Sequence, residues 1–409
     1  MAAQIDALLR AMVQAGASDL HMTSGEVAKA RIDGSMRNLS KNLIERDTML
    51  RLLKEIAPEA NWGEFVELND TDFAYEIPEL ARFRANYFRD LTGPGAVFRQ
   101  IPSKILSAEA LGLPDAILKL CTLHKGMVLV TGPTGSGKST TLAAMIDYIN
   151  ETRDDHIITV EDPVEFVHPN KRCLVNQREI RTHTANFKSA LRAALREDPD
   201  IILVGELRDK ETVEIALEMA ETGHLVFGTL HTTTAAKTVD RIVDQFESDQ
   251  QEQIRSMMAS TLKGVISQNL LKKIGGGRVA AQEILLITNA VANYIREGKT
   301  HQIPLAMQTG KKLGMQDLNT ALFARVQQGL VTPQEAVAKA EEPEPLEKEL
   351  TRYGLMGPAS PPPSTTGAPA GGSATTQQMP KQALDEARRR AAAAATRPLP
   401  LKKKKTWFS

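Results

Sequence analysis

Residues 132–139 read Gly132-Pro133-Thr134-Gly135-Ser136-Gly137-Lys138-Ser139, which fits the pattern G-x-x-x-x-G-K-[ST]. The apolar residues 127–130 before this stretch predict a short buried strand. The residues 140–149 after it predict a helix whose apolar face is formed by Leu142, Met145, Ile146 and Ile149. A strand, a glycine-rich loop and the start of a helix therefore follow one another, as a phosphate-binding loop requires.

The residue types in this loop suit a nucleoside triphosphate. Glycines let the backbone curl until several N–H groups point inward, and the start of the helix adds positive potential. Lys138 is expected to reach the β- and γ-phosphates, and the Ser139 hydroxyl is expected to bind Mg²⁺. A chance glycine-rich turn is the alternative, but the flanking segments favour the loop. We expect ATP to bind at Gly132, Pro133, Thr134, Gly135, Ser136, Gly137, Lys138, Ser139 and Thr140.

The overall composition is that of a globular protein with room for more than one domain. The chain has 409 residues, 42% of them hydrophobic, which suggests two or three domains and a sizeable core. Its formal net charge is zero, so no overall field attracts nucleic acid, and we expect no nucleic-acid partner. The two cysteines, Cys121 and Cys173, exclude a multi-cysteine zinc site. Without an apolar run of about 20 residues or a signal pattern, a soluble cytoplasmic protein is expected.

Residues 1–100 predict a small α+β domain. The chain is expected to open with an amphipathic helix, because helical spacing separates Ile5, Leu8, Leu9 and Met12. Short strands are predicted at 28–32, 72–75 and 83–87, with Asp33-Gly34 as a turn. Residues 101–115 are a predicted linker, in which Pro114 opens a short helix.

Three arginines in this domain admit two interpretations. Arg82 and Arg84 lie two residues apart, so on a strand they share a face, and Arg99 ends the run 96–99. Most arginines are exposed, so solvated surface arginine is the favoured reading on residue type alone. The functional alternative is a set of arginine fingers for the nucleotide of a neighbouring subunit.

Beyond the phosphate loop, strands and helices alternate, which predicts a mostly parallel sheet with helices on both faces. Three strands deliver polar groups to one edge: 156–160 leads into Glu161-Asp162-Pro163-Val164-Glu165, 201–204 into Gly205-Glu206-Leu207-Arg208-Asp209, and 225–230 runs from His224 to His231. Each group alone could be a solvated turn or a histidine satisfied by backbone. Ligands bind at the carboxyl ends of such strands, so their joint placement beside the loop favours a site.

The C-terminal half of this domain, which we place at 116–345, is predicted to be helical. Core or subunit packing is expected for a long helical stripe formed by Ile254, Met257, Met258, Leu262, Val265, Ile266 and Leu270. Gly275-Gly276-Gly277 predicts a flexible turn and not a second phosphate loop, because no Lys-Ser/Thr follows it. Further helices are expected as far as about Lys339.

Residues 346–409 predict a low-complexity tail. The segment 357–381 is rich in Pro, Ser, Thr, Gly and Ala, which cannot bury enough apolar surface to offset the entropy of ordering. Residues 384–395 could form a short helix. The tip at 402–408 contains four lysines, Trp407 and Phe408. It is read as a solvated end, with a weak anchor to anionic lipid or an acidic partner as the alternative.

Taken together, these motifs resemble the type II/type IV secretion ATPase superfamily, and within it the pilus retraction ATPases. The resemblance covers roughly residues 1–340 and is carried by the phosphate loop and by Ala17-Ser18-Asp19-Leu20-His21, the segment 158–168, Val175-Asn176-Gln177-Arg178-Glu179, and the segments 196–209 and 221–232. It implies a RecA-like phosphate-loop ATPase domain and a small N-terminal α+β domain of PAS-like type. The tail after about Pro345 has no counterpart in the family pattern, and its disorder is expected from composition alone.

The resemblance implies roles for the residues around the nucleotide. Lys138 and Ser139 match the Walker A pair. Glu165 is the last residue of the family's acidic box and matches the base that orients water at the γ-phosphate. Glu206 matches the Walker B acid, which acts on Mg²⁺ through water. Gly205 stands where many phosphate-loop ATPases carry Asp, a departure that this family shares.

Two further groups of residues receive roles in the same way. His231, with His224, matches the histidine box that senses the γ-phosphate. Arg82, Arg84 and Arg99 match arginines that such hexamers bring toward nucleotide. The resemblance thus raises the arginine-finger interpretation above that of solvated surface arginine.

The resemblance finally implies an assembly and a task. Such ATPases form homohexameric rings in which the N-terminal domain of one subunit packs on the ATPase domain of the next. ATP hydrolysis moves these units, and an inner-membrane platform protein couples the motion to removal of pilin from the fibre base. The expected location is the cytoplasmic face of the inner membrane at the pilus base, with paralogous retraction or extension ATPases as further partners.

The output of the motor has alternatives. Extension and secretion relatives carry a longer N-terminal region, and many carry a four-cysteine zinc element, neither of which this sequence has. Retraction ATPases carry Ala-Ile-Arg-Asn-Leu-Ile-Arg-Glu near the C-terminus, whereas residues 290–297 place Ala292 at the first arginine. This departure leaves an accessory retraction ATPase as an alternative to the main motor. A DNA-translocating hexamer and a non-enzymatic nucleotide-sensing subunit are weaker, given the neutral charge and the retained Lys138, Glu165 and Glu206.

Overall fold

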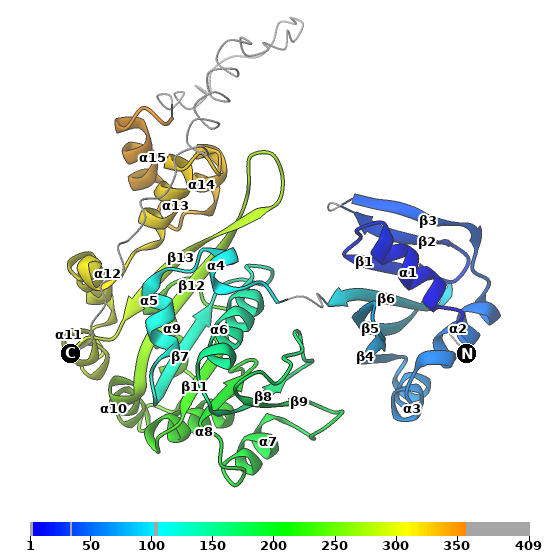
Figure 1. Ribbon diagram of the computed structural model, residues 1–409, viewed down its shortest axis with the longest axis horizontal. Coiled ribbons are helices and arrows are strands. Elements are labelled where there is room, and N and C mark those ends of the chain that lie inside the picture. Colours follow the sequence, from blue (N-terminus) through cyan, green and yellow to red (C-terminus); the bar gives the residue numbers. More distant parts are fainter. Residues whose placement is uncertain (1–2, 33–34, 102–104, 357–409) are drawn as a thin grey trace, which may run out of the picture. The chain divides into compact units, whose positions relative to one another are not determined.

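The computed structural model of the chain describes residues 3–32, 35–101 and 105–356. They form two sheets covered by helices, and the sheets have separate apolar cores (Figure 1). The predicted turn at 33–34, residues 102–104 of the predicted linker, and everything predicted from 357 onward lie outside the described residues. Within the described ranges, no helix combines the length and apolar character needed to cross a membrane.

The N-terminal sheet has six antiparallel strands in the order β3-β2-β1-β6-β5-β4. Its elements are α1 (Asp6–Gln14), β1 (Asp19–Thr23), β2 (Val27–Ile32), β3 (Ser35–Leu43), α2 (Arg46–Ile56), α3 (Glu59–Leu68), β4 (Asp70–Ile77), β5 (Ala81–Asp90) and β6 (Gly93–Ile101). Buried aromatic side chains fill its core, among them Phe65, Phe83, Tyr87 and Phe98. The predicted opening helix and the three predicted strands are confirmed.

The second sheet has seven strands in the order β13-β12-β7-β11-β10-β8-β9. Strand β7 (Gly126–Thr131), which leads into the phosphate loop, is third in this order and pairs in parallel with β11 (Leu225–Leu230) and β12 (Leu262–Lys272). Beyond β11 come β10 (Ile201–Val204), β8 (His156–Glu161) and β9 (Leu174–Glu179), all parallel, while β13 (Arg278–Leu286) runs antiparallel to β12. The predicted mostly parallel sheet is confirmed, but the sequence does not predict β9, and β13 is a strand where helices are expected.

Helices cover both faces of this sheet, so β7 is buried on both sides. Met127 and Leu129 of β7 pack with α7 (Phe187–Ala194), α8 (Lys210–Glu221), α9 (Ala235–Val243) and α10 (Gln251–Thr261). Val128 and Val130 point the other way and pack with α4 (Ala108–Leu111), α5 (Asp115–Cys121) and α6 (Lys138–Thr152). The predicted linker is therefore shorter than 101–115, since α4 contributes Ala108 to the core.

The helical stripe predicted over 254–270 is wrong in its second half. Helix α10 ends at Thr261, and β12 begins at Leu262. Strand β12 lies between β7 and β13 and is buried on both faces along most of its length, so its apolar residues do not alternate with polar ones. Without that alternation, periodicity does not distinguish a short strand from a buried helix. The predicted turn at 275–277 is confirmed and joins β12 to β13.

Helices follow β13 to the end of the described residues. They are α11 (Asn289–Arg296), α12 (Ile303–Thr309), α13 (Leu318–Gln327), α14 (Pro333–Lys339) and α15 (Pro343–Arg352), with short 3₁₀ turns η1 (Thr300–Gln302) and η2 (Gly310–Leu313). Helix α15 crosses the predicted domain end at 345 and buries Leu346 and Leu350 against α13 and α14. The packed domain therefore extends beyond the predicted boundary, because two leucines in the acidic segment supply an apolar stripe.

Candidate active site

The phosphate loop has a backbone that only glycine adopts readily. Gly132, Gly135 and Gly137 have φ angles of 142°, 78° and 86°, in the region that favours glycine. A Cβ atom on Gly132 would lie 2.3 Å from the backbone oxygen of Gln268, so the loop also passes too close to β12 for a side chain. Gly137 occupies the N-cap position, and α6 begins at Lys138.

The ammonium group of Lys138 is buried at the mouth of the loop. Its Nζ donates to the carbonyl oxygens of Gly132 at 2.8 Å and Pro133 at 3.2 Å. Burial lowers the pKa of the Lys138 ammonium, and the nearby carboxylates of Glu206 and Glu165 oppose that effect. A buried cation among N–H groups and backbone oxygens suits an anionic phosphate, so the residues present fit a nucleotide.

Glu206 follows β10 and forms two polar contacts beside Lys138. Its Oε1 lies 3.0 Å from Nε2 of His231, and its Oε2 lies 2.7 Å from Nη2 of Arg208. Burial acts to raise the pKa of the Glu206 carboxyl, but the hydrogen bond from Arg208 and the charges of Arg208, His231 and Lys138 outweigh it, and the net pKa is lowered. Glu206 is thus held as a carboxylate at the edge of the sheet.

His231 follows β11 and connects two of these groups. Its Nδ1 lies 3.5 Å from Nζ of Lys138, while its Nε2 faces Glu206. A lysine ammonium can only donate, so Nδ1 is the accepting nitrogen and Nε2 carries the hydrogen that Glu206 accepts. One imidazole therefore contacts both the loop lysine and the carboxylate after the neighbouring strand.

A pocket lies beside these residues. It is lined by Ser139, Leu142, Ala143, Glu161, Asp162, Pro163, Glu165, Phe166, His168, Phe187, Leu203, Gly205, Glu206, Arg208 and Thr229. Ser139 and Glu206 both line it. Mg²⁺ prefers oxygen ligands and often takes only one or two from the protein when phosphates supply others, so these two residues fit it.

The acidic segment 161–165, which begins at the last residue of β8, contributes two glutamates to the pocket. Glu161 accepts hydrogen bonds from the Thr159 hydroxyl at 2.8 Å and the Gln177 amide at 3.3 Å. Burial raises the pKa of Glu161 to about 7, despite these hydrogen bonds. Glu165 is exposed at the rim, and its backbone N–H lies 3.3 Å from Oε2 of Glu161.

His224 does not join this site. It precedes β11, whereas His231 follows it, so the six residues of the strand separate the two histidines by about 20 Å. Its Nδ1 lies 2.9 Å from the carbonyl oxygen of Met219, near the end of α8. The two histidines therefore do not meet within one chain: only His231 reaches the loop of its own chain, and the expected role of His224 stays a prediction.

The three N-terminal arginines each pair with an acid of the same chain. Their partners are Glu179 for Arg82 at 2.8 Å, Asp72 for Arg84 at 3.5 Å, and Asp19 for Arg99 at 2.8 Å. Arg84 and Arg99 stand directly opposite each other on β5 and β6. None of the three lines the pocket beside the phosphate loop of its own chain.

The sequence does not single out three residues that line the pocket or contact the phosphate loop. Arg208 lies two residues after Glu206, a position that the strand end could have suggested. Glu161 was read only as part of the acidic segment. Gln268 lies in the segment read as helix, so its contact with the loop had no signal in the sequence.

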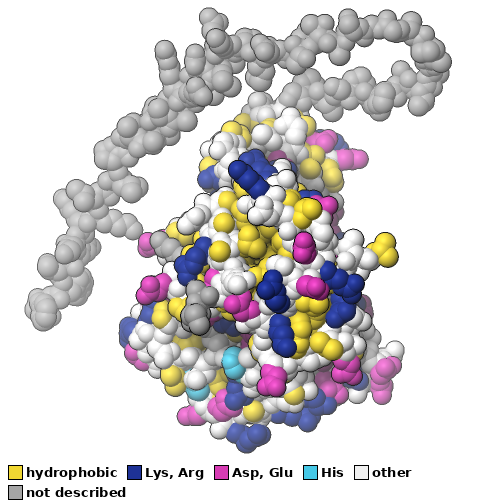
Figure 2. All heavy atoms as spheres, turned by 90° about the vertical axis from the view of Figure 1, so that its right-hand side faces the viewer, with side chains coloured by type: hydrophobic (Ala, Val, Ile, Leu, Met, Phe, Trp, Pro, Cys, Tyr) yellow, Lys and Arg dark blue, Asp and Glu magenta, His cyan; other side chains and the backbone are white. Residues whose placement is uncertain are grey.

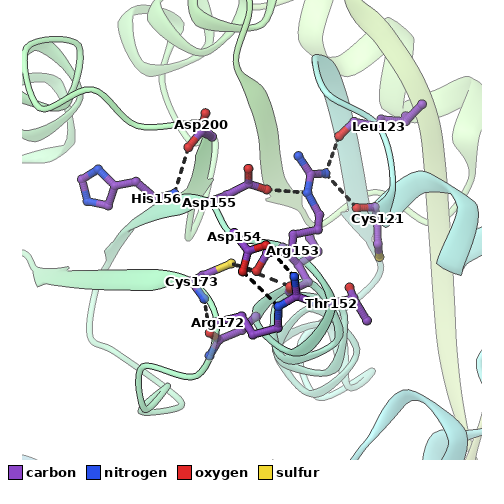
Figure 3. A network of polar contacts seen from close by, with 12 residues as sticks. Cys121, Leu123, Thr152, Arg153, Asp154, Asp155, His156, Arg172, Cys173 and Asp200 are labelled. Atoms are coloured by element: carbon purple, nitrogen blue, oxygen red, sulfur yellow. Dashed lines mark hydrogen bonds and ion pairs between the residues drawn. The ribbon is translucent and has the colours of Figure 1, made fainter.

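Figure 3 shows a separate polar network at the start of β8, on the edge away from the loop. Arg153 follows α6, and its Nη1 donates to the carbonyl oxygens of Cys121 at 3.1 Å and Leu123 at 2.6 Å. Its Nε pairs with Asp155, and the backbone N–H of His156 donates to Asp200 at 2.9 Å. These contacts anchor the far end of the helix that begins at Lys138.

Comparison with known proteins places this site in a family. Residues 1–276 match the model of the type II/IV secretion system protein family. The chain is 53% identical over 340 residues to the type IV pilus retraction ATPase PilT of Pseudomonas aeruginosa, covering 83% of this chain and 99% of that protein. It is 51% identical over 334 residues to a twitching motility protein of Neisseria gonorrhoeae, covering 80% and 89%.

A solved structure agrees with these relatives. The crystal structure of the pilus retraction motor PilT with bound ADP is 48% identical, with a TM-score of 0.78, and the match covers 84% of this chain and 98% of that one. Its ADP is consistent with the nucleotide site derived above. The chain belongs to the type II/IV secretion system protein family.

Proposed function

We propose that this chain is an ATPase that powers the retraction of type IV pili. The observation that carries the proposal is the contact series from Lys138 through His231 to Glu206 at the carboxyl ends of three parallel strands. It combines a phosphate-binding amine with a carboxylate suited to Mg²⁺. The retraction motor named above, with its bound ADP, supports both the chemistry and the task.

The residues of the pocket divide the work of hydrolysis. The loop and Lys138 hold the phosphates, and Ser139 and Glu206 hold Mg²⁺, with Glu206 acting through water. When bound, Mg²⁺ neutralises charge that develops on the phosphate oxygens. Glu165 orients the attacking water, because its side chain is exposed at the pocket rim and is the acid matched by the resemblance. His231 detects the γ-phosphate through its contacts with Lys138 and Glu206.

The arginines complete the site in an assembly. A homohexameric ring would place Arg82, Arg84 or Arg99 of one subunit at the nucleotide of the next. Arg99 supports this idea, because its side chain is 68% exposed although it pairs with Asp19. Asp19 is buried, but it also accepts from the Ser18 hydroxyl and lies 4.0 Å from Arg31, so it keeps polar partners when Arg99 turns toward a phosphate.

The proposed location and partner protein follow from the same family resemblance. The ring acts at the cytoplasmic face of the inner membrane, at the pilus base, against a platform protein. A second candidate is an accessory retraction ATPase working beside a paralogue, because Ala292 replaces an arginine. Ala292 lies on α11 and packs partly buried against the core, so it contributes packing where a charge is expected.

A DNA-translocating role has less support. Figure 2 shows basic and acidic side chains interspersed on the face that it presents, without a continuous basic stripe there. Binding along a nucleic-acid backbone relies on clustered Lys and Arg.

Deletion of the gene tests the proposal. Cells without it should still assemble pili but fail to shorten them, and the wild-type gene should restore shortening where a Lys138→Ala gene does not. Loss of pilus assembly would instead indicate an extension motor. Normal retraction in the deletion strain would overturn the main-motor proposal, and a partial defect that depends on load would favour the accessory role.

A further inference from the structure

Gln268 is a buried side chain that joins β12 to the phosphate loop and to the first turn of α6. It is 3% exposed. Its Nε2 donates to the carbonyl oxygen of Ser136 at 2.7 Å. Its Oε1 accepts from the Thr141 hydroxyl at 2.7 Å and from Nε2 of Gln282 at 2.9 Å. Gln282 stands opposite it on β13, so two neighbouring strands hold this amide against the loop.

The orientation of this amide is fixed by its partners. A backbone carbonyl can only accept, so the NH₂ group of Gln268 must face Ser136. The remaining oxygen then faces two donors, Thr141 and Gln282. Rotating the amide by 180° would place oxygen against oxygen at Ser136, so the arrangement has one satisfied state.

The contact with Ser136 determines the direction of the next backbone N–H. In a planar trans peptide, the carbonyl of Ser136 and the N–H of Gly137 point in opposite directions. A carbonyl held toward β12 therefore turns the Gly137 N–H away from β12. Gly137 is free to take this direction because it has φ +86°, and a Cβ there would lie 2.9 Å from Nε2 of Gln268.

We propose that Gln268 is a positioning residue for nucleotide binding, and that it acts by holding the Ser136–Gly137 peptide so that the Gly137 N–H faces the phosphates. The inference rests on the proposed nucleotide site at residues 132–140. Gln268 itself does not contact the nucleotide. It prepares in advance a donor that the loop would otherwise have to order when the phosphate binds.

Substitution of Gln268 by methionine tests this role. Gln268→Met keeps an unbranched chain of similar length but removes the donor to Ser136. We expect the Kd for ADP to rise about tenfold to a hundredfold, as for one lost hydrogen bond to a charged group. The KM for ATP should rise by a similar factor while kcat changes less, because the N–H contacts the phosphates before and during the reaction.

Gln282→Met is the matched control, since Gln282 is equally buried and binds the same amide without touching the loop. It should lower the melting temperature without a comparable change in ADP affinity. Gln268→Glu distinguishes the accepting oxygen of the amide from its donating NH₂ group, because a carboxylate still accepts from Thr141 and Gln282 but no longer donates to Ser136. We expect it to weaken ADP binding at least as much as Gln268→Met.

The outcomes are distinct. Near-normal ADP affinity in folded Gln268→Met overturns the positioning role, as does an equal loss in Gln282→Met. A mild effect of Gln268→Glu together with a severe effect of Gln268→Met would assign the role to the accepting oxygen and overturn it as well. Failure of the wild-type chain to bind ADP would instead overturn the nucleotide site itself.

Discussion

Nε2 of His231 lies 3.0 Å from Oε1 of Glu206, while Nδ1 of the same ring lies 3.5 Å from Nζ of Lys138. The three side chains follow β11, β10 and the phosphate loop, so the ring of His231 touches residues from two other segments. If phosphate binding at Lys138 changes what the amine donates to, the ring would carry that change to Glu206. This geometry supports the proposed role of His231 as a phosphate sensor.

Substitution of the two histidines should therefore have different effects. His231→Ala should slow ATP turnover by about tenfold or more, since it breaks both contacts of the ring. His224→Ala should leave turnover of the assembled protein near normal, because His224 bonds to the end of α8 at the other end of β11. Steady-state ATPase assays of both variants provide the measurement. Equal loss in the two would mean that His224 acts at a site that the single chain does not contain.

The division of roles in the pocket predicts a binding variant and a turnover variant. Lys138→Ala should abolish nucleotide binding, because it removes the buried ammonium at the loop. Glu165→Gln should bind ATP normally but lose turnover by about 10²–10⁴-fold, the usual effect of removing a general base. Calorimetry and ATPase assays separate the two effects. If Glu165→Gln stays active, Glu206 becomes the next candidate for the base, and Glu161→Gln should be tested beside it.

If the protein forms a ring, mixing two different inactive variants should restore part of the ATPase activity. If Arg82, Arg84 or Arg99 acts on a neighbour, activity should rise more than linearly with protein concentration as rings assemble. Mixing Lys138→Ala subunits with subunits that lack the responsible arginine should restore part of the ATPase activity at mixed interfaces. The mixture must first be shown to contain intact hexamers. No recovery with any of the three arginines would mean that they act within one subunit or only in packing.

Two truncations should distinguish the packed C-terminal helices from the tail. A chain ending at residue 357 should form hexamers and hydrolyse ATP at nearly the full rate, because it retains α15. A chain ending at 345 should be less stable by a few kcal/mol, about the cost of removing two buried leucines, since it loses Leu346 and Leu350. Melting temperature and ATPase rate provide the measurements.

The chain ending at 357 also tests the role of the tip at 402–408. Its four lysines, each contributing about 1 kcal/mol near an anionic membrane, could add weak membrane affinity. The chain ending at 357 should then lose part of its enrichment at the membrane in cells. Unchanged localisation would remove the anchor while leaving the motor intact, whereas collapse of its ATPase would contradict the dispensable tail.

Glu283 predicts a pH-dependent stability. It lies on β13 and accepts from the backbone N–H of Ala235 at 2.7 Å. Burial raises its pKa to about 7, opposed by that hydrogen bond and reinforced by Glu341 and Asp317. Because the folded pKa lies above the unfolded value, this group's contribution is fully present below about pH 4.5 and is lost as the pH rises through 7.

Glu283→Gln should therefore stabilise the chain relative to wild type at pH 8.5 but much less at pH 5.5. The pKa difference corresponds to about 3 kcal/mol at alkaline pH. Unfolding curves at the two pH values test this. A difference between variant and wild type that is the same at both pH values would show that Glu283 does not titrate in this range.

The sequence by itself determined the strand, loop and helix around Lys138, because the spacing of these residues is local. It also determined that Glu206 and His231 share an edge with the loop, since alternating strands and helices form a parallel sheet whose carboxyl ends meet. The division into an N-terminal antiparallel sheet and a mostly parallel sheet with separate cores followed from the same alternation and from the short strands that precede it.

Only the tertiary structure decided three other features. The segment from Leu262 became a strand because it is buried between two neighbours, a context that its apolar spacing does not encode. His224 lies far from His231 because the two histidines stand at opposite ends of strand β11. Gln268 reached Ser136 across 132 residues of sequence, which required β12 to lie beside β7. Contacts of this kind depend on which strands become neighbours, and local residue patterns carry no record of that choice.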